Sequence, residues 1–598
     1  MAREVAESTP LLVVSVERTE AVSCSISTEA EVSDDLQRQS RSLLAVGIFF
    51  MAAAAWAASK SSVTAFSYGK TSLSSSSSGG IGSISGSSGK GIRGFFKTNR
   101  RKEKELSFLL STVGSGRASR LADGVPDYPW AKLLEPHREA TLEAELEGAT
   151  GDEIYTWTID GGEKTLQGQT VQFTPTRIGW HDIAITVTTT DGISLSSSAA
   201  VSTASTKVTE RVMSKYVRRE LRSLSDSERE RVLDAMHSIY KYTTAEGQAK
   251  FASLSKMSSK FKDIAYFVSK HLKGGASLEC DSWHDGAGYL NNHAAFSLEF
   301  EQAMQASDPT VALPYWDFTL DYHRQKYDGL DWRQGGVFQD SWFGAASPAR
   351  KDHAVDGTGR WALTPVLKVD RSDPAQVAAH PISNPYGLLR SPWNANPTPF
   401  VARSDTVAGY MAFDGEMPSC ESYDMCFVSS SAAVMNECLN GITHGPVHIE
   451  VGGLWHKDLS GKLGGTDSLL DGDLAYQLLL ISKNLWRQGY MRCPNTCATS
   501  DEKTSNSSSE YSLCSCSCPA AAIGGASSYE VLTDKTGIMH WVAKIAQDGA
   551  VEWNVAAQRY RITGYENDPV GEAAVWDSLL HEVLCDPGHV GDMCVPLF

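Results

Sequence analysis

The order of apolar and polar positions divides the chain into a β-rich part followed by a longer helical part. In the β-rich part, Ile154–Ile159 alternates and is followed by the turn residues Asp160–Gly162. The stretch Thr170–Phe173 alternates next, and His181–Thr188 does so again. Alternation with a period of two is typical of strands with one buried face. Short strands at this spacing predict a small β-sandwich over residues 131–205.

The same region carries a short local motif. Tyr155, Trp157 and Ile159 are spaced two residues apart before Asp-Gly, and the run Gly179–Ile183 follows. This pattern resembles an immunoglobulin-like domain of the PKD type. The resemblance implies a module that spaces or binds other parts, with a protein partner that the residues do not identify.

From Lys207 onward, apolar residues recur every three or four positions, a period that predicts helices. We expect a first helix over Val208–Val217. Ser225 and Glu228 then have the spacing of a capping box and open the next helix. These patterns place a mainly α-helical domain at residues 207–598.

The first 130 residues show neither the two-residue period of strands nor the period of amphipathic helices, and they contain one apolar run. Residues 1–42 are polar and acidic, and we expect a disordered tail. Residues 43–58 are apolar and predict a signal-anchor that crosses a membrane once, with a cleaved signal peptide as the alternative. Residues 59–130 are rich in Ser and Gly and then basic, which is typical of a linker.

Composition narrows the class of protein and its compartment. The formal charge of −17 does not favour a nucleic-acid partner. Eleven of the twelve cysteines lie between Cys280 and Cys594, and five of these form an insertion at 493–518. Because the second group of that insertion is C-x-C-x-C, we favour disulfides over a zinc site. Disulfides place the helical domain in the secretory pathway, either lumenal or outside the cell.

Three histidines lie within 23 residues in the helical part. His271 ends an apolar helical run, and His284 follows in a polar segment. His293 begins an amphipathic stretch with Phe296 and Phe300 on one face. A single histidine most often packs or donates a hydrogen bond, but three converging neutral imidazoles can bind a metal ion.

The surroundings of these histidines resemble the first copper-binding region of the tyrosinase family of type 3 copper proteins. The shared features are the spacing from His284 through His293 to Phe296 and the segment Leu313–Asp317, Leu-Pro-Tyr-Trp-Asp. The resemblance covers roughly residues 208–598. It implies a helical bundle around two copper ions, with His271, His284 and His293 binding the first.

A second pair of histidines lies further along the chain. His444 and His448 are four residues apart, so they share one face if the segment is helical. With Gly452 and Gly453 they resemble the second copper-binding region of tyrosinases, where they would be the first two ligands. Pro446 is compatible with this helix if it lies in the first turn.

The third ligand of the second copper has no clear counterpart. The family has it in a later run, Asp-Pro-x-Phe-Trp-x-x-His, whereas the apolar segment Leu474–Trp486 contains no histidine. His581 and His589 are the alternatives for this sixth ligand. The run Gly588–Met593 also resembles tyrosinase-like proteins of algae and water moulds, in which the last copper histidine follows that motif. The resemblance therefore suggests that the sequence stops short of it, after Phe598.

The resemblance implies an activity. Two copper ions would use dioxygen to oxidise catechols to quinones, with a small phenol as the substrate. Hydroxylation of monophenols is less expected, because Gly445 stands where many hydroxylating members have Asn after the first histidine. Two alternatives remain: a dioxygen carrier, and a catalytically impaired relative with an incomplete second site that acts as a binding or structural protein.

Overall fold

The computed structural model of the protein describes residues 106–112, 132–147, 149–190, 203–286, 288–334, 336–346, 350–409, 416–429, 431–455, 481–497, 514–539 and 551–592. The predicted tail at 1–42 and the predicted signal-anchor at 43–58 lie outside these residues. Most of the predicted linker at 59–130 does too, but its residues 106–112 form a strand. Among the described helices, none is long and apolar enough to cross a membrane.

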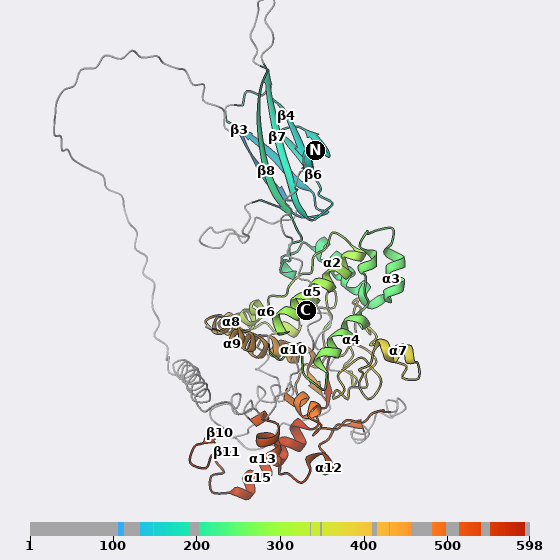
Figure 1. The fold of residues 1–598 in the computed structure, drawn as a ribbon, viewed down its shortest axis with the longest axis vertical. Coiled ribbons are helices and arrows are strands. Elements are labelled where there is room, and N and C mark those ends of the chain that lie inside the picture. Colours follow the sequence, from blue (N-terminus) through green and yellow to red (C-terminus); the bar gives the residue numbers. More distant parts are fainter. Residues whose placement is uncertain are drawn as a thin grey trace, which may run out of the picture. The chain divides into compact units, whose positions relative to one another are not determined.

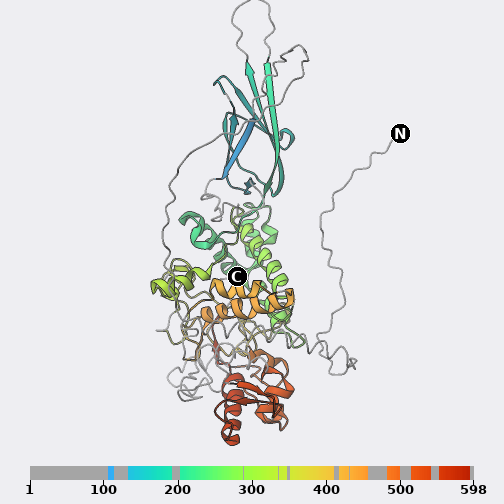
Figure 2. The same cartoon turned by 90° about the vertical axis from the view of Figure 1, so that its left-hand side faces the viewer.

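The β-rich part forms two sheets (Figures 1 and 2). One sheet has the strand order β1-β3-β6, and the other has the order β2-β8-β7-β4-β5. The strands are β1 Leu106–Thr112, β2 Leu133–Leu134, β3 Ala140–Leu146, β4 Ile154–Ile159, β5 Lys164–Gln167, β6 Thr170–Phe173, β7 Gly179–Thr190 and β8 Thr203–Ser214. All pairs are antiparallel except β2 with β8.

Alternate residues of both sheets meet in one apolar core. Leu142 of one sheet and Trp157 and Ile183 of the other are each 0% exposed. The indole N–H of Trp157 donates to the carbonyl of Gly168 at 2.9 Å, so burying the ring leaves no unpaired donor. The prediction of a β-rich region before the helical domain is thereby confirmed.

The predicted helix over Val208–Val217 is wrong. Most of these residues belong to β8, which pairs with β7 over its whole length. Val212 and Ser214 are buried whereas Arg211 is exposed, which is the two-residue period of a strand. Val208 and Val212 are four residues apart, an interval that fits either period, and pairing with β7 selects the strand. The sheet therefore continues past residue 205, where the β-sandwich was expected to end.

The remaining described residues form a mainly helical domain with four short strands (Figures 1 and 2). Its helices are α2 Asp226–Lys241, α3 Thr244–Phe251, α4 Ile264–Gly275, α5 Gly288–Ser307, α6 Phe318–His323, α7 Pro374–Ala379, α8 Cys420–Phe427, α9 Ala432–Cys438, α10 Gly445–Gly452, α12 Ala520–Ile523, α13 Ser528–Glu530 and α15 Pro569–Ser578. The strands are β9 Leu454–Trp455, β10 Val551–Asn554, β11 Arg559–Ile562 and β12 His589–Val590.

Local sequence signals fix the start of α2. The side chain of Ser225 accepts a hydrogen bond from the amide of Glu228, and the Glu228 carboxylate accepts one from the amide of Ser225. This reciprocal arrangement satisfies two amides that the helix leaves unpaired, typically stabilising it by about 1 kcal/mol. The predicted capping box is confirmed.

Aromatic packing holds α4 against α5. Phe267 of α4 lies 5.5 Å from Phe296 and 5.0 Å from Phe300 of α5, measured between ring centroids. All three rings are at most 1% exposed. The buried face of α5 is the one that the sequence predicts, although the helix begins at Gly288, five residues before His293. This contact fixes the two helices that carry His271 and His293.

Four disulfides lie in the helical domain among the described residues, which confirms the preference for disulfides in the insertion. They join Cys426 to Cys438, Cys493 to Cys516, Cys497 to Cys514 and Cys518 to Cys585. The last of these ties the insertion to the C-terminal helical segment. Such bonds form and persist in an oxidising compartment.

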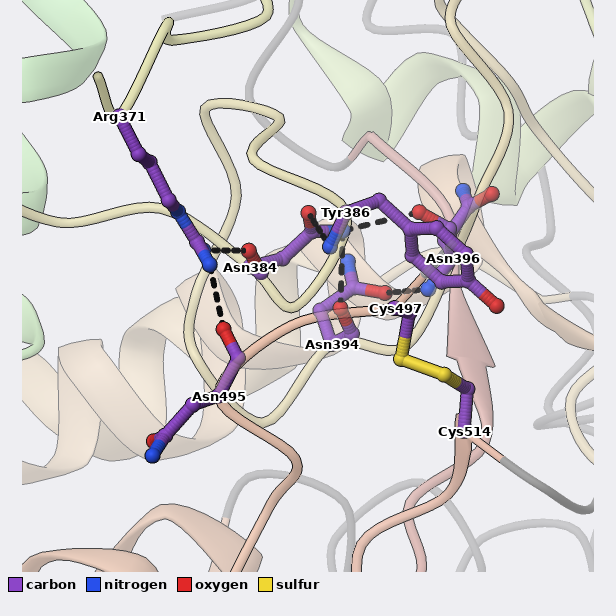
Figure 3. Close-up of a disulfide and its surroundings, with 8 residues drawn as sticks. All are labelled: Arg371, Asn384, Tyr386, Asn394, Asn396, Asn495, Cys497 and Cys514. Carbon is purple, nitrogen blue, oxygen red and sulfur yellow. Dashed lines mark hydrogen bonds between the residues drawn. A yellow bond between two sulfur atoms is a disulfide. The ribbon is translucent and has the colours of Figure 1, made fainter. Parts of the chain in front are cut away.

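Figure 3 shows how the insertion meets an asparagine-rich loop. Tyr386 packs beside the Cys497–Cys514 disulfide. The buried amide of Asn384 donates to the carbonyls of Asn394 and Asn396, at 3.1 and 2.9 Å. Side chains, rather than a sheet, therefore hold this loop in shape.

The same loop holds β12 in place. The side-chain amides of Asn394 and Asn396 both donate to the carbonyl of Val590, at 2.9 and 3.2 Å. Arg390 donates to both carboxylate oxygens of Asp592, at 2.9 and 2.7 Å. We call residues 589–592 the C-terminal strap, because these contacts and the pairing of β12 with β9 fasten it to the domain.

Candidate metal centre

Three of the predicted histidines converge. His271 comes from α4, His284 from the turn before α5, and His293 from the second turn of α5. One ring nitrogen of each lies within 4.8 Å of those of the other two. The ring centroids of His271 and His284 are 5.0 Å apart. A set of three imidazoles from separate elements is suited to a copper or zinc ion.

A carboxylate orients His284. The fully buried side chain of Asp281 accepts hydrogen bonds from Nδ1 of His284 at 2.9 and 3.0 Å. Because Nδ1 then carries the proton, the lone pair of Nε2 is left to face a metal ion. Lys483 donates to the same carboxylate at 2.7 Å, which compensates its buried charge.

The main chain and tight packing fix the other two rings. Nδ1 of His293 donates to the carbonyl of Tyr289 at 2.7 Å, which again leaves Nε2 free to bind a metal. The indole of Trp283 lies 5.0 Å from the ring of His271. It also packs so close to Gly274 that a Cβ atom there would lie 2.3 Å from the indole. This α4 position therefore needs glycine to keep Trp283 against His271.

His444 and His448 lie next to the three histidines. His444 ends a π-helical turn, Leu439–His444, and its ring centroid is 5.3 Å from that of His293. Its Nε2 is 2.8 Å from Nε2 of His448, which lies one turn further on. Pro446 lies in the first turn of α10, where its missing amide proton removes no helical hydrogen bond. The predicted i, i+4 pair therefore shares one face.

The environment favours the neutral form of three of these imidazoles, those of His271, His293 and His444. Desolvation, with the neighbouring imidazoles adding to it, lowers the pKa of His271 and of His444 well below the ordinary value. Desolvation likewise lowers the pKa of His293. Burial alone would raise the pKa of Asp281, but the hydrogen bond from His284 and the charge of Lys483 hold it below its usual range. Neutral histidines beside an ionised carboxylate are the form that binds a metal ion.

The two candidates for the sixth ligand lie at the C-terminal end of the described residues. His581 is exposed on a π-helical turn, Leu579–Leu584. His589 is buried on β12, with its ring edge-on to Trp455 at 6.1 Å. Among the described residues, His271, His284 and His293 are the one group of three or more potential metal ligands that lie close together. Neither His581 nor His589 belongs to it.

The histidines separate two cavities. His271 and His284 line a cavity of about 290 Å³, whose wall includes residues 590–592 of the C-terminal strap. We call it the polar cavity because charged side chains stand among its otherwise largely apolar lining residues. His293 lines an apolar cavity of about 630 Å³. His444 and His448 line both. A small molecule can therefore reach the histidines from two sides.

Sequence reasoning missed the groups that surround the ligands. Asp281 stands three residues before His284, a spacing that could have drawn attention to it. Lys483 and Asn440 are far from the first three histidines in the sequence, yet Lys483 pairs with Asp281 and Asn440 donates to the carbonyl of His284 at 2.7 Å. Residues so distant in sequence give no local pattern.

Comparison with known proteins fits this geometry. Residues 232–469, which include all five clustered histidines, match the common central domain of tyrosinase. A tyrosinase from Streptomyces lincolnensis is 31% identical over 128 residues, or 20% of this chain and 44% of that protein. A tyrosinase from Streptomyces antibioticus is 26% identical over 135 residues, or 21% and 45%.

A shorter match of higher identity involves grixazone synthase from Streptomyces griseus, which is 51% identical over 39 residues, or 6% of this chain and 13% of that protein. The chain thus spans less than half the length of each of these relatives. The matched region and the converging histidines agree on one assignment. Residues 232–469 are similar to the common central domain of tyrosinase, and the type 3 copper family is therefore the one that this part of the chain resembles.

Proposed function

We propose that the helical domain is a copper-dependent oxidoreductase that oxidises catechols to quinones with dioxygen. The observation that carries this proposal is the convergence of His271, His284 and His293, with His444 and His448 beside them. Ordinary structural histidines are not gathered in this way around two cavities. The overall reaction converts two catechols and one dioxygen into two quinones and two waters.

The described histidines would supply three ligands for one copper ion but only two for the other. His271, His284 and His293 would hold the first ion, and His444 and His448 would hold the second. Its remaining ligand would come from His581 or from His589. Copper bound there would supply the one-electron chemistry that links oxidation of a catechol to reduction of dioxygen.

The chain's own groups prepare the site. Asp281 and the carbonyl of Tyr289 hold the protons of His284 and His293 on Nδ1, so both rings present Nε2. The apolar packing of Trp283 and Phe296, 5.1 Å apart, limits the access of water to this side of the cluster. Gly445, which lines the polar cavity, offers no side chain to accept the proton of a monophenol, and no aspartate or glutamate is among the described residues that line the apolar cavity. We therefore propose catechols, rather than monophenols, as the preferred substrates.

Copper content and quinone formation test this function together. The purified full chain is loaded with copper, its metal content is measured, and quinone formation from catechol is followed by absorbance. We expect two copper ions per chain and oxygen-dependent quinone formation. His293→Ala should abolish the activity, whereas His323→Ala, which changes an exposed histidine on α6, should leave it unchanged. Two bound ions without quinone formation would instead support a dioxygen carrier.

One observation favours a second function. Among the described residues, His444 and His448 do not form a group of three potential ligands. A chain that binds a single copper ion and makes no quinone would be a catalytically impaired relative that acts as a binding or structural protein. A copper content near one per chain, lost in His293→Ala and retained in His448→Ala, would support this alternative over the oxidase.

We also propose the setting in which the domain works. The four disulfides support passage through the secretory pathway. With residues 43–58 as a membrane anchor, the tyrosinase domain would lie in a lumen or outside the cell. The β-rich region would space it from the membrane or bind a protein partner. Protease protection of the domain in intact vesicles, lost on adding detergent, tests this topology.

A further inference from the structure

The apolar cavity is built from aromatic and aliphatic side chains. Its wall includes Trp316 and Phe318 near α6, Tyr423 and Phe427 of α8, and Val447 of α10. Phe318 stacks on Tyr423 at 6.0 Å and an interplanar angle of 28°. Among the described residues that line this cavity, none is an aspartate, glutamate, lysine or arginine. A charged group that entered it would lose its hydration and find no partner.

The cavity reaches both the histidines and the surface. Its inner wall contains His293, His444 and His448. At its outer rim, Phe427 is 59% exposed and Leu290 is 40% exposed. The volume of about 630 Å³ lies within the range of small-molecule sites. A ring-sized apolar molecule can therefore be in contact with solvent at one end and with the imidazoles at the other.

The polar cavity on the opposite side has a different character. Asp281, Arg390, Lys483 and Asp592 line it. Arg390 pairs with Asp592, and Lys483 pairs with Asp281. These charges satisfy one another and hold the walls in place. The two cationic residues that the structure describes in the wall of the polar cavity, Arg390 and Lys483, are therefore both engaged by carboxylates and are not available to select a negatively charged phenol.

We propose that the apolar cavity binds the substrate, and that the preferred substrates are uncharged catechols with an apolar substituent. This inference rests on the proposed oxidase function and specifies its substrate class. The hydroxyl end of the ring meets His293, His444 and His448, and the substituent lies among the rings of α6 and α8. Catechols that carry a carboxylate or an ammonium group are poor substrates, because the cavity cannot compensate their charge.

Paired substrates and a charge placed at the cavity test this inference. The copper-loaded full chain is assayed with 4-tert-butylcatechol and with 3,4-dihydroxybenzoate. We expect kcat/KM to be higher for the neutral substrate by about tenfold or more. Ala294, which lines the cavity and is exposed, is changed to Glu or to Lys. Ala294→Glu should increase the ratio of kcat/KM for 4-tert-butylcatechol to kcat/KM for 3,4-dihydroxybenzoate, and Ala294→Lys should decrease it.

Ala295→Glu and Ala295→Lys are the matched controls, because Ala295 is exposed on the same helix but does not line the cavity. Both should leave the preference unchanged. Ser391→Glu places a charge in the polar cavity instead. If Ser391→Glu shifts the preference and the Ala294 variants do not, the substrate uses the polar cavity and this inference is wrong, while the oxidase stands. If no catechol yields quinone in the wild type, the proposed function itself fails.

Discussion

Asp281 and His284 are joined twice, once through the main chain and once through the ring. The amide of His284 donates to Oδ1 of Asp281 at 2.9 Å, and Nδ1 of the same histidine donates to Oδ2 at 2.9 Å. The carboxylate therefore fixes the backbone turn and the tautomer together. A metal-binding histidine held in this way is oriented before the ion arrives.

Asp281→Asn should weaken copper binding by about 10- to 100-fold, because a neutral amide no longer stabilises the proton on Nδ1. Competition with a chelator of known affinity measures this change. Asp285→Asn is the control, since the side chain of Asp285 is 53% exposed and forms ion pairs with Lys483 and Arg487 rather than a hydrogen bond to the ring of His284. Equal copper affinities of the two variants would contradict an orienting role for Asp281.

Lys483→Met should destabilise the copper-free protein by about 3 kcal/mol, because it leaves the fully buried carboxylate of Asp281 without its closest cation. Urea unfolding of the wild type and the variant measures the difference. Lys326→Met removes the exposed pair with Glu416, and its expected loss is below about 1 kcal/mol. Asp281 also lies 3.7 Å from Arg487 and accepts from His284, so a loss for Lys483→Met as small as that for Lys326→Met would show that these partners compensate the carboxylate without Lys483.

The copper-free protein should lose stability as the pH falls below about 6.5, the pKa of histidine in an unfolded chain. The pKa values of His271 and His444 are lowered in the folded state. Between the folded and unfolded pKa values the unfolded chain binds more protons, so acid favours unfolding. Thermal unfolding from pH 7.5 to 5 should show a smaller fall in Tm for His271→Gln/His444→Gln than for the wild type. An equal fall in Tm with pH for the variant and the wild type would show that His271 and His444 are not the groups responsible.

Asp592→Asn should loosen the C-terminal strap. The guanidinium of Arg390 is 2% exposed and would lose its carboxylate partner, a change of about 3–5 kcal/mol for a buried pair. Hydrogen–deuterium exchange of the amides of Val590 and Gly591 should quicken. Glu582→Gln, on an exposed position nearby, should leave this exchange unchanged. Unaltered exchange in Asp592→Asn would show that Asn394 and Asn396 hold the strap without the ion pair.

Short-range patterns in the sequence predicted much of the helical domain. The capping box of α2, the buried face of α5 and the pairing of His444 with His448 all depend on spacings of three or four residues. The strand β8 was missed because its valines fit two periods, and only its pairing with β7 decides between them. Lys483 could not be assigned to Asp281, because 202 residues separate them and each alone has the character of a surface residue.

The four disulfides have a chemical consequence beyond fastening the insertion. A quinone is an electrophile, and thiolates are the strongest common nucleophiles on a protein. Eight cysteines of the described helical domain are bonded in pairs and cannot add to it. If the helical domain is the oxidase that we propose, the disulfides thereby protect these positions from covalent modification by the quinone it releases.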